Sequence, residues 1–378
     1  MKQLRWFEGT LWSGMQLVAW LRLLARNRLA VSPRRIPMAL AITVLATVNT
    51  GLGWWQHARY GRRLRQVRLP DDPLFIIGHW RTGTTMLHEL LALDHRNRCP
   101  TTYESLSPNH FLVSEPFARR WFSFVIPRKR PFDQMRLGFD RPQEDEVALC
   151  NLGSPSPFLT VAFPNRPPQY PNYVDLERLS SRQLLRWQAT MRKFLQSLLF
   201  RRPGRLVLKS PQHTFRVKML LKMFPRARFV HIVRDPYVVF PSTVHFWKVM
   251  YASYGLQRPR LDALHQQVFE TFRAMYEKFE ATRSLIDPSR LFELRYEDLV
   301  ADPVAQVCTL YARLELGDFS VARRAVEDYA VRSKRYRSNQ YELSEETRKQ
   351  ITHQWKWFIE KYDYGCEEDH VASPTNES

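Results

Sequence analysis

The chain has 378 residues, of which 44% are hydrophobic and 13% aromatic, and this composition predicts a packed globular protein and excludes a largely disordered one. Its formal net charge of +20 favours an anionic partner, such as a nucleic acid, a lipid headgroup or a polyanionic substrate or cofactor. The widely spaced Cys99, Cys150, Cys308 and Cys366 match neither a disulfide framework nor a paired metal site, and they favour a reducing compartment.

Residues 1–60 form a basic and apolar helical segment for which we expect membrane association. Residues 1–35 place tryptophans and leucines beside arginines, which is typical of a helix at a membrane interface, and they lack the cleavage site of a secretory signal. Residues 36–57 carry no charged side chain and are long enough to cross a bilayer, but threonines, glycines and Asn49 make them only moderately hydrophobic. Arginines flank both ends, so the charge pattern gives no orientation. Three arrangements stay open: a single span, a hairpin lying in one leaflet, and a helix docked on the following domain.

A strand, a loop and a helix follow the basic linker at residues 58–72. Residues 74–77 are apolar and predict a buried strand, residues 78–83 predict a turn, and a helix begins at Thr84. Backbone N–H groups at such a helix start bind anions, and the helix dipole favours negative charge there. The two glycines of the turn have the spacing of a nucleotide-triphosphate loop, but Thr84 replaces the lysine that such a loop requires, and the cation comes earlier as Arg81. The pattern therefore predicts a phosphate-binding loop that does not hold a triphosphate and Mg²⁺.

Strands and helices alternate along the rest of the chain. Residues 98–140, rich in proline, arginine and aromatic side chains, are expected to be irregular. We predict further strands at residues 205–208, 228–233 and 290–295, and further helices at residues 141–149, 176–200, 214–224 and 237–250. This alternation predicts an α/β fold, a P-loop-like, doubly wound parallel sheet with flanking helices, in which ligands bind beyond the carboxyl ends of the strands.

Polar side chains follow three of the predicted strands. Arg81 follows the first strand, Lys209 and His213 follow the second, and Arg234 follows the third. Because the carboxyl ends of parallel strands meet at one edge of a sheet, we expect these side chains to converge. Ser242 lies eight residues after Arg234, a little over two helical turns, so it can face the same ligand. Two anion sites without the triphosphate-loop lysine indicate a nucleotide that carries phosphate at both ends.

These motifs resemble those of the sulfotransferases that use 3′-phosphoadenosine-5′-phosphosulfate (PAPS). The segment Arg81-Thr82-Gly83-Thr84-Thr85 resembles the 5′-phosphosulfate loop of that family, in the arginine-containing form of its bacterial members. Arg234 and Ser242 resemble the 3′-phosphate site, and Lys209-Ser210-Pro211 resembles the turn before that strand. In relatives, a basic segment near the end often closes over the nucleotide, and here Lys334 and Arg335 lie in the similar segment.

The resemblance implies transfer of a sulfuryl group from PAPS to an acceptor hydroxyl. Arg81 and Lys209 would stabilise the charge that develops on the leaving phosphate, and a base must accept the hydroxyl proton. Relatives with an arginine-type loop often use a glutamate downstream of the loop as this base, which makes Glu104 the first candidate and His213 the second. The mechanism requires no metal.

We therefore expect a membrane-associating segment at residues 1–60, a sulfotransferase domain at residues 73–365 and a disordered tail at residues 366–378. The expected acceptor is a hydroxyl-bearing lipid or carbohydrate, and the aromatic residues at 103–170 favour a lipid. No nucleic acid partner is expected, and the catalytic domain is assigned to the cytoplasmic side of a membrane. Two other classes stay open: a P-loop kinase or NTPase, and a non-catalytic basic protein that binds membranes or nucleic acid.

Overall fold

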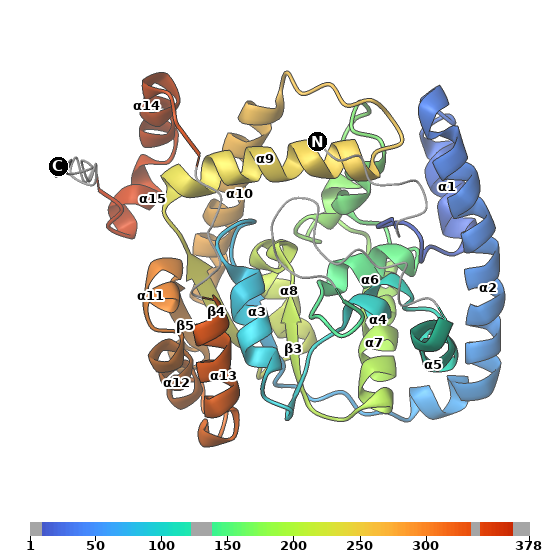
Figure 1. Cartoon of the computed structure of the whole chain (residues 1–378), viewed down its shortest axis with the longest axis horizontal. Helices are drawn as coiled ribbons and strands as arrows, with labels where there is room; N and C mark the ends of the chain where they lie inside the picture. The colour runs from blue at the N-terminus through green and yellow to red at the C-terminus, as the bar shows by residue number, and fades with distance from the viewer. Residues whose placement is uncertain (1–9, 122–137, 334–340, 366–378) are drawn as a thin grey trace, which may run out of the picture.

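The computed structural model describes residues 10–121, 138–333 and 341–365 (Figure 1). In this part of the chain, five strands form one parallel sheet in the order β2-β3-β1-β4-β5. The strands are β1 (Leu74–Ile77), β2 (Asn97–Arg98), β3 (Arg205–Lys209), β4 (Arg228–Val233) and β5 (Leu291–Arg295). The first strand lies in the middle and the chain winds to both sides of it, which confirms the predicted doubly wound α/β fold.

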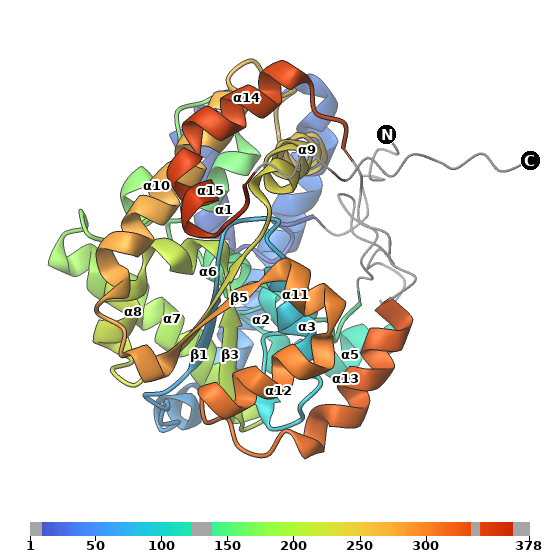
Figure 2. The same ribbon diagram turned by 90° about the vertical axis from the view of Figure 1, so that its left-hand side faces the viewer.

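Helices cover both faces of the sheet (Figure 2). They are α1 (Leu17–Arg26), α2 (Ile36–Arg65), α3 (Thr84–Ala92), α4 (Thr102–Leu106), α5 (Phe111–Trp121), α6 (Asp145–Asn151), α7 (Ser181–Arg201), α8 (Val217–Met223), α9 (Pro236–Tyr254), α10 (Leu264–Arg283), α11 (Tyr296–Ala301), α12 (Pro303–Arg313), α13 (Ser320–Ser333), α14 (Glu345–Gln354) and α15 (Lys356–Lys361). Because successive side chains of a strand point to opposite faces, Leu74 and Ile76 pack with α3 and α11 to α13, whereas Phe75 and Ile77 pack with α7, α8 and α10. A strand buried on both faces needs the continuous apolar run that β1 has.

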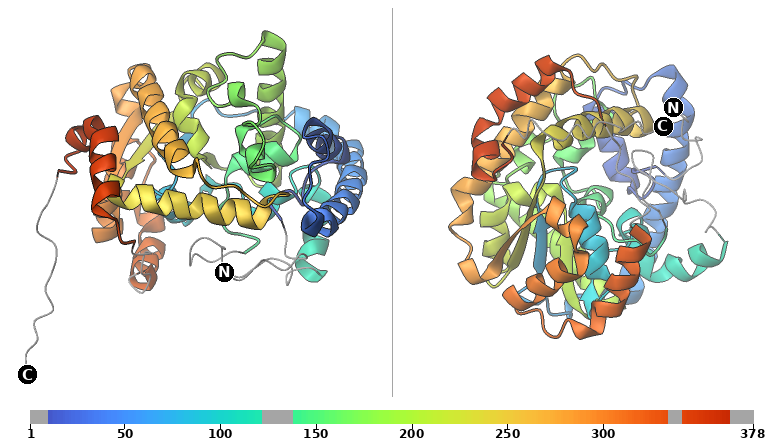
Figure 3. Two further views of the ribbon diagram at one scale, coloured as in Figure 1. Left: turned by 90° about the horizontal axis from the view of Figure 1, so that it is seen from above. Right: turned by 60° about the vertical axis from the view of Figure 1, so that its left-hand side comes forward.

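Helix α9 crosses the carboxyl ends of the strands (Figure 3). Its start is fixed by Asp235, whose side chain accepts a hydrogen bond from the backbone N–H of Tyr237, and by Pro236 at the first helical position. The helix runs from α14 and α15 at one end toward α1 and α2 at the other. It therefore connects the sheet to the N-terminal helices.

The N-terminal helices α1 and α2 form an antiparallel hairpin that is docked on the domain. The backbone N–H of Leu17 donates to the Thr50 hydroxyl at 2.9 Å, and the Trp20 indole donates to the Thr43 hydroxyl at 2.9 Å. Helix α2 packs against α5 and α7, and residues of the hairpin share a hydrophobic core with Trp80 and Val147. Among the described residues, one helix, Pro33–Arg65, is long and apolar enough to cross a membrane. Of the three arrangements left open by the sequence, the docked helix matches the structure.

The main error of the sequence reading falls in residues 98–140, which were expected to be irregular. This region contains α4 and α5, and β2 ends inside it. Helix α4 begins with a capping box, in which Thr101 accepts from the Glu104 backbone N–H and the Glu104 side chain accepts from the Thr101 backbone N–H. Elsewhere, the helix expected to begin at Arg141 begins at Asp145, and a 3₁₀ turn precedes α8. The predicted tail, residues 366–378, lies outside the described residues.

Candidate active site

The loop between β1 and α3 has a backbone that few residues can adopt. Arg81 has a φ of 71° and Gly83 a φ of 95°, both in the left-handed region. A Cβ atom on Gly83 would lie 2.2 Å from the Cδ2 atom of Tyr296, so this close approach requires glycine. Helix α3 begins with no side-chain cap and no acidic residue in its first turn. The positive end of its dipole is therefore not neutralised by the helix itself.

Three of the predicted phosphate-binding side chains meet at this loop. The Arg81 Nε donates to the Ser242 hydroxyl at 2.9 Å, and the Arg234 Nη1 donates to the Arg81 carbonyl at 3.1 Å. The Arg234 guanidinium also lies 4.1 Å from the centre of the Tyr296 ring. Burial, together with the nearby positive charge of Arg81, lowers the pKa of Arg234 from its ordinary value. The positive charges of Arg81 and Arg234 lie near each other, and this arrangement favours a bound anion.

Lys209 lies at the carboxyl end of β3, on the other side of the loop. Its Nζ is 2.8 Å from the Glu144 carboxylate and 3.5 Å from the Thr85 hydroxyl. The Lys209 side chain is only 2% exposed and that of Glu144 is 17% exposed, so water screens this ion pair weakly. One cation thus joins the phosphate loop to a carboxylate on the residue before α6.

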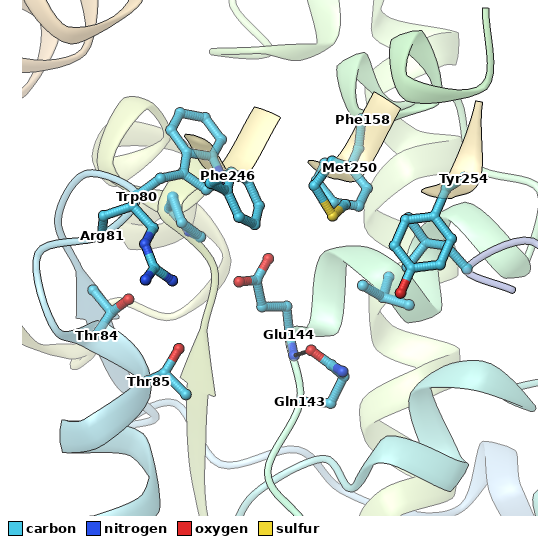
Figure 4. A pocket seen from close by; sticks show the side chains of 13 residues that line it. Trp80, Arg81, Thr84, Thr85, Gln143, Glu144, Phe158, Phe246, Met250 and Tyr254 are labelled. Atoms are coloured by element: carbon cyan, nitrogen blue, oxygen red, sulfur yellow. Dashed lines mark hydrogen bonds between the residues drawn. The ribbon is translucent and has the colours of Figure 1, made fainter. Parts of the chain in front are cut away.

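A pocket beside the loop joins Arg81 and Glu144 to an apolar wall (Figure 4). It encloses about 710 Å³ of empty space, including the part that is open to solvent. Arg81, Thr84, Thr85 and Glu144 line its polar side, with the Arg81 guanidinium and the Glu144 carboxylate pointing toward each other. The apolar side consists of Leu11, Trp80, Val147, Phe158, Pro211, Phe246, Met250 and Tyr254. The pocket can therefore hold a charged group at one end and an apolar molecule at the other.

The structure does not bring Glu104, the first base candidate, into this pocket. Its carboxylate forms an ion pair with Arg98 and accepts the Thr101 backbone N–H at 2.9 Å, and both side chains of the pair are buried. Glu104 instead lines a different, polar pocket with Arg119. These contacts are those of a structural residue that caps α4.

His213, the second base candidate, is also absent from the residues that line the pocket. Its Nε2 contacts the Asp145 carboxylate at 2.8 Å, and its ring packs edge-on against Phe75. Burial would raise the pKa of Asp145, but the charge and hydrogen bond of His213 outweigh burial and lower it. The pair is buried and ties the first residue of α6 to the turn after β3.

The remaining predicted site residues differ in their placement. The Thr82 hydroxyl donates to the His79 carbonyl at 2.8 Å and is buried inside the loop, whereas Thr84 and Thr85 line the pocket. Lys334 and Arg335 lie outside the described residues.

The sequence reasoning missed Glu144 and the apolar wall. Glu144 lies in the helix predicted at residues 141–149, and no role in the site was predicted for it. No local motif marks it, and the tertiary structure is what brings its carboxylate to Lys209. Leu11 carries no motif, and only the tertiary structure brings it to the pocket.

Comparisons with known proteins agree with this geometry. The family model described as "Sulfotransferase family" matches residues 73–320. Relatives from Mycobacterium bovis and Mycobacterium tuberculosis, both named omega-hydroxy-beta-dihydromenaquinone-9 sulfotransferase Stf3, are 47% identical to the chain over 362 residues. The match covers 95% of this chain and 93% of each relative.

Two solved structures share the fold. Sulfotransferase STF1 from Mycobacterium tuberculosis H37Rv aligns with a TM-score of 0.64 at 18% identity, over 92% of this chain and 93% of the other. Sulfotransferase STF9 from Mycobacterium avium aligns with a TM-score of 0.65 at 17% identity, over 94% of this chain and 98% of the other.

Proposed function

The chain belongs to the sulfotransferase family, and we propose that it transfers the sulfuryl group of PAPS to the hydroxyl of a lipid acceptor at a membrane. The observation that carries this proposal is the pocket in which Arg81, Thr84 and Thr85 face the Glu144 carboxylate beside an apolar wall. A donor with phosphate groups suits the polar side, and an apolar acceptor suits the other.

The residues around the loop fit a nucleotide with phosphate at both its 5′ and 3′ positions. Arg81, Thr84, Thr85 and the uncapped start of α3 suit the 5′-phosphosulfate. Arg234 and Ser242, both in contact with Arg81, suit the 3′-phosphate. Among the described residues, no group of three or more His, Cys, Asp or Glu side chains is arranged to hold a metal.

PAPS supplies an activated sulfuryl group, whose sulfur bonds to the acceptor oxygen while its bond to the 5′-phosphate oxygen breaks and leaves the electron pair on that oxygen. Arg81 and Lys209 stabilise this developing negative charge. One such donor lowers the activation free energy by roughly 3–4 kcal/mol. Lys209 also contacts Thr85, which keeps its ammonium group at the loop. The transfer therefore depends on positioned cations rather than on a covalent intermediate with the protein.

Glu144 is the base in this proposal, in place of Glu104 and His213. Its carboxylate lines the pocket, where it is paired with Lys209 and faces Arg81, whereas Glu104 and His213 lie outside the pocket in buried pairs with Arg98 and Asp145. The acceptor hydroxyl proton moves to a Glu144 oxygen as the oxygen–sulfur bond forms. A positioned base of this kind accelerates a reaction about 10²–10⁴-fold.

The proposed acceptor is the terminal hydroxyl of a long isoprenoid quinone or a lipid of similar shape. The relatives at 47% identity are named for such a substrate, an omega-hydroxylated dihydromenaquinone. The aromatic and aliphatic wall formed by Trp80, Phe158, Phe246 and Met250 suits a hydrocarbon chain. A carbohydrate acceptor would need more polar partners than this wall offers.

The proposal includes membrane association, with the catalytic domain in the cytoplasm. The exposed apolar side chains of α1 and α2 support membrane contact. Cys99, Cys150 and Cys308 are free thiols, which suits a reducing compartment.

Thermal unfolding of the full chain with 3′,5′-diphosphoadenosine, compared with ADP and with ATP-Mg²⁺, tests the donor site. A ligand at a hundred times its dissociation constant stabilises a protein by about 2.7 kcal/mol, so we expect a clear shift with the diphosphoadenosine. A shift with ATP-Mg²⁺ alone would instead support a kinase or NTPase. Labelled PAPS with a lipid extract then tests the acceptor, and label confined to water-soluble acceptors would contradict the lipid proposal.

A further inference from the structure

The outer face of the α1–α2 hairpin carries an unusual number of exposed large apolar side chains. They are Val18, Leu21, Leu29, Ile36, Leu40, Val44, Leu45, Val48, Trp54 and Trp55. Val44 is 65% exposed and Trp54 is 73% exposed. On α2, Ile36, Leu40, Val44 and Val48 follow one another at four-residue intervals and Trp55 comes seven residues after Val48, so these side chains form a stripe along one side of the helix. Soluble proteins rarely leave such a stripe in water.

The inner face of α2 is largely apolar and includes two polar side chains, which are hydrogen-bonded to the rest of the protein. The Asn49 amide donates to the Ser13 carbonyl at 2.7 Å, and its oxygen contacts the His110 Nε2 at 3.0 Å. The Gln56 oxygen accepts the backbone N–H of Leu112 at 2.8 Å. Asn49 and Gln56 are both buried. Moving α2 away from the domain to span a bilayer would break these hydrogen bonds. The bonds therefore hold the helix against the domain, with its apolar stripe facing outward.

The charge around the stripe is of one sign. From Gly9 to Pro70 the sequence contains no aspartate or glutamate. Exposed arginines flank the stripe at both ends: Arg22, Arg26, Arg28 and Arg34 on one side, and Arg59, Arg62, Arg63, Arg65 and Arg68 on the other. Such a pattern complements an anionic lipid surface, where each basic residue near the headgroups adds about 1 kcal/mol.

We propose that the α1–α2 hairpin docks on an anionic phospholipid bilayer with α2 parallel to the membrane plane, its apolar stripe in the acyl region and its arginines among the headgroups. This proposal rests on the proposed function in one respect: it assumes that the membrane delivers the lipid acceptor. A helix of 30 residues is about 45 Å long, so the stripe gives an extended contact rather than a point anchor.

The same hairpin forms part of the catalytic pocket. Leu11, in the segment before α1, lines the pocket beside Tyr254, and the Trp12 indole donates to the Tyr254 carbonyl at 2.9 Å. The loop between α1 and α2 is bonded to the segment after α9, because Ser32 donates to the Leu256 carbonyl and Gln257 to the Ala30 carbonyl, both at 2.9 Å. Docking of the hairpin would therefore fix the apolar wall of the pocket relative to the bilayer.

Flotation of the full chain with phosphatidylcholine vesicles, with and without phosphatidylglycerol, tests the docking. We expect binding to the vesicles that contain phosphatidylglycerol, weakened by salt. The double variant Val44→Glu, Val48→Glu should reduce vesicle affinity about 100-fold, since each lost valine contact is worth about tenfold. Val321→Glu, at an exposed position of α13, is the matched control and should float like the unmodified chain. Flotation of the double variant equal to that of the control would overturn the proposal.

Two further measurements distinguish parallel docking from a membrane-spanning helix and from the proposed function. Carbonate extraction should release the protein from vesicles, whereas retention after extraction would show a spanning helix and overturn the parallel docking. The double variant should keep its thermal shift with 3′,5′-diphosphoadenosine and its transfer to a short, water-soluble isoprenoid alcohol, but lose transfer to an acceptor embedded in vesicles. If the unmodified chain fails both soluble assays, the proposed function is wrong, and vesicle binding then decides the docking by itself.

Discussion

Replacing Glu144 by glutamine separates the proposed base from the residues that only bind the donor. Glutamine keeps the size of the side chain and can still accept a hydrogen bond from Lys209, which lies 2.8 Å away, but it cannot take up a proton. We expect kcat to fall about 10²–10⁴-fold, which corresponds to about 2.7–5.4 kcal/mol in the barrier. The change also removes a negative charge beside Lys209 and Arg81, so the affinity for 3′,5′-diphosphoadenosine should stay the same or rise. Single-turnover transfer from labelled PAPS and calorimetric titration measure the two quantities.

Glu104→Gln is the matched control, because it makes the same chemical change in a buried glutamate outside the pocket. It leaves Arg98 without a charged partner, and breaking a buried pair of this kind costs about 3–5 kcal/mol of stability. We therefore expect a lower melting temperature and, below it, an unchanged kcat. The reasoning is refuted if Glu104→Gln abolishes turnover in a folded protein while Glu144→Gln retains it.

Three further substitutions test the rest of the site. Arg234→Ala removes charge-assisted hydrogen bonds worth about 1.5–3 kcal/mol, so calorimetry should show 3′,5′-diphosphoadenosine binding roughly 10- to 100-fold more weakly. Gly83→Ala places a methyl group against Tyr296 at a φ of 95° and should lower both the melting temperature and nucleotide affinity, whereas Gly51→Ala, which meets nothing within 4 Å, should stabilise α2 by about 0.5–1 kcal/mol. Asp145 has a lowered pKa, so its stabilising contribution is present above its ordinary pKa of 3.8 and is lost as the pH falls through the lowered value. Asp145→Asn should therefore flatten the acid limb of a plot of stability against pH, and an unchanged limb would contradict this assignment.

The sheet and the phosphate loop were predictable because their signals are local. An apolar run followed by a glycine-bounded turn defines β1 and the start of α3, and the run at residues 228–233 defines β4 to the residue. The convergence of Arg81, Arg234 and Ser242 followed from a general property of parallel sheets, whose strand ends share one edge.

The proposed base and the apolar wall were not predictable in the same way because they depend on contacts between distant segments. Glu104 is three residues after Thr101, and this spacing was a readable helix-start signal that would have argued for a structural role. Glu144 reaches the pocket only because α6 packs near the end of β3. The sequence left the orientation of α2 open, and the structure buries Asn49 and Gln56 while Val44 and Val48 stay exposed.

The presence of Leu11 in the pocket has a consequence for how relatives of this chain diverge. The region matched by the family model, residues 73–320, contains the donor-binding motifs but not Leu11 or the hairpin. Two chains with identical phosphate loops can thus differ in the shape of the apolar wall through a change at the position of Leu11, which lies far from the loop in the sequence. Exchanging residues 10–65 between such chains, with the rest left intact, is the most direct way to transfer one acceptor preference to another protein.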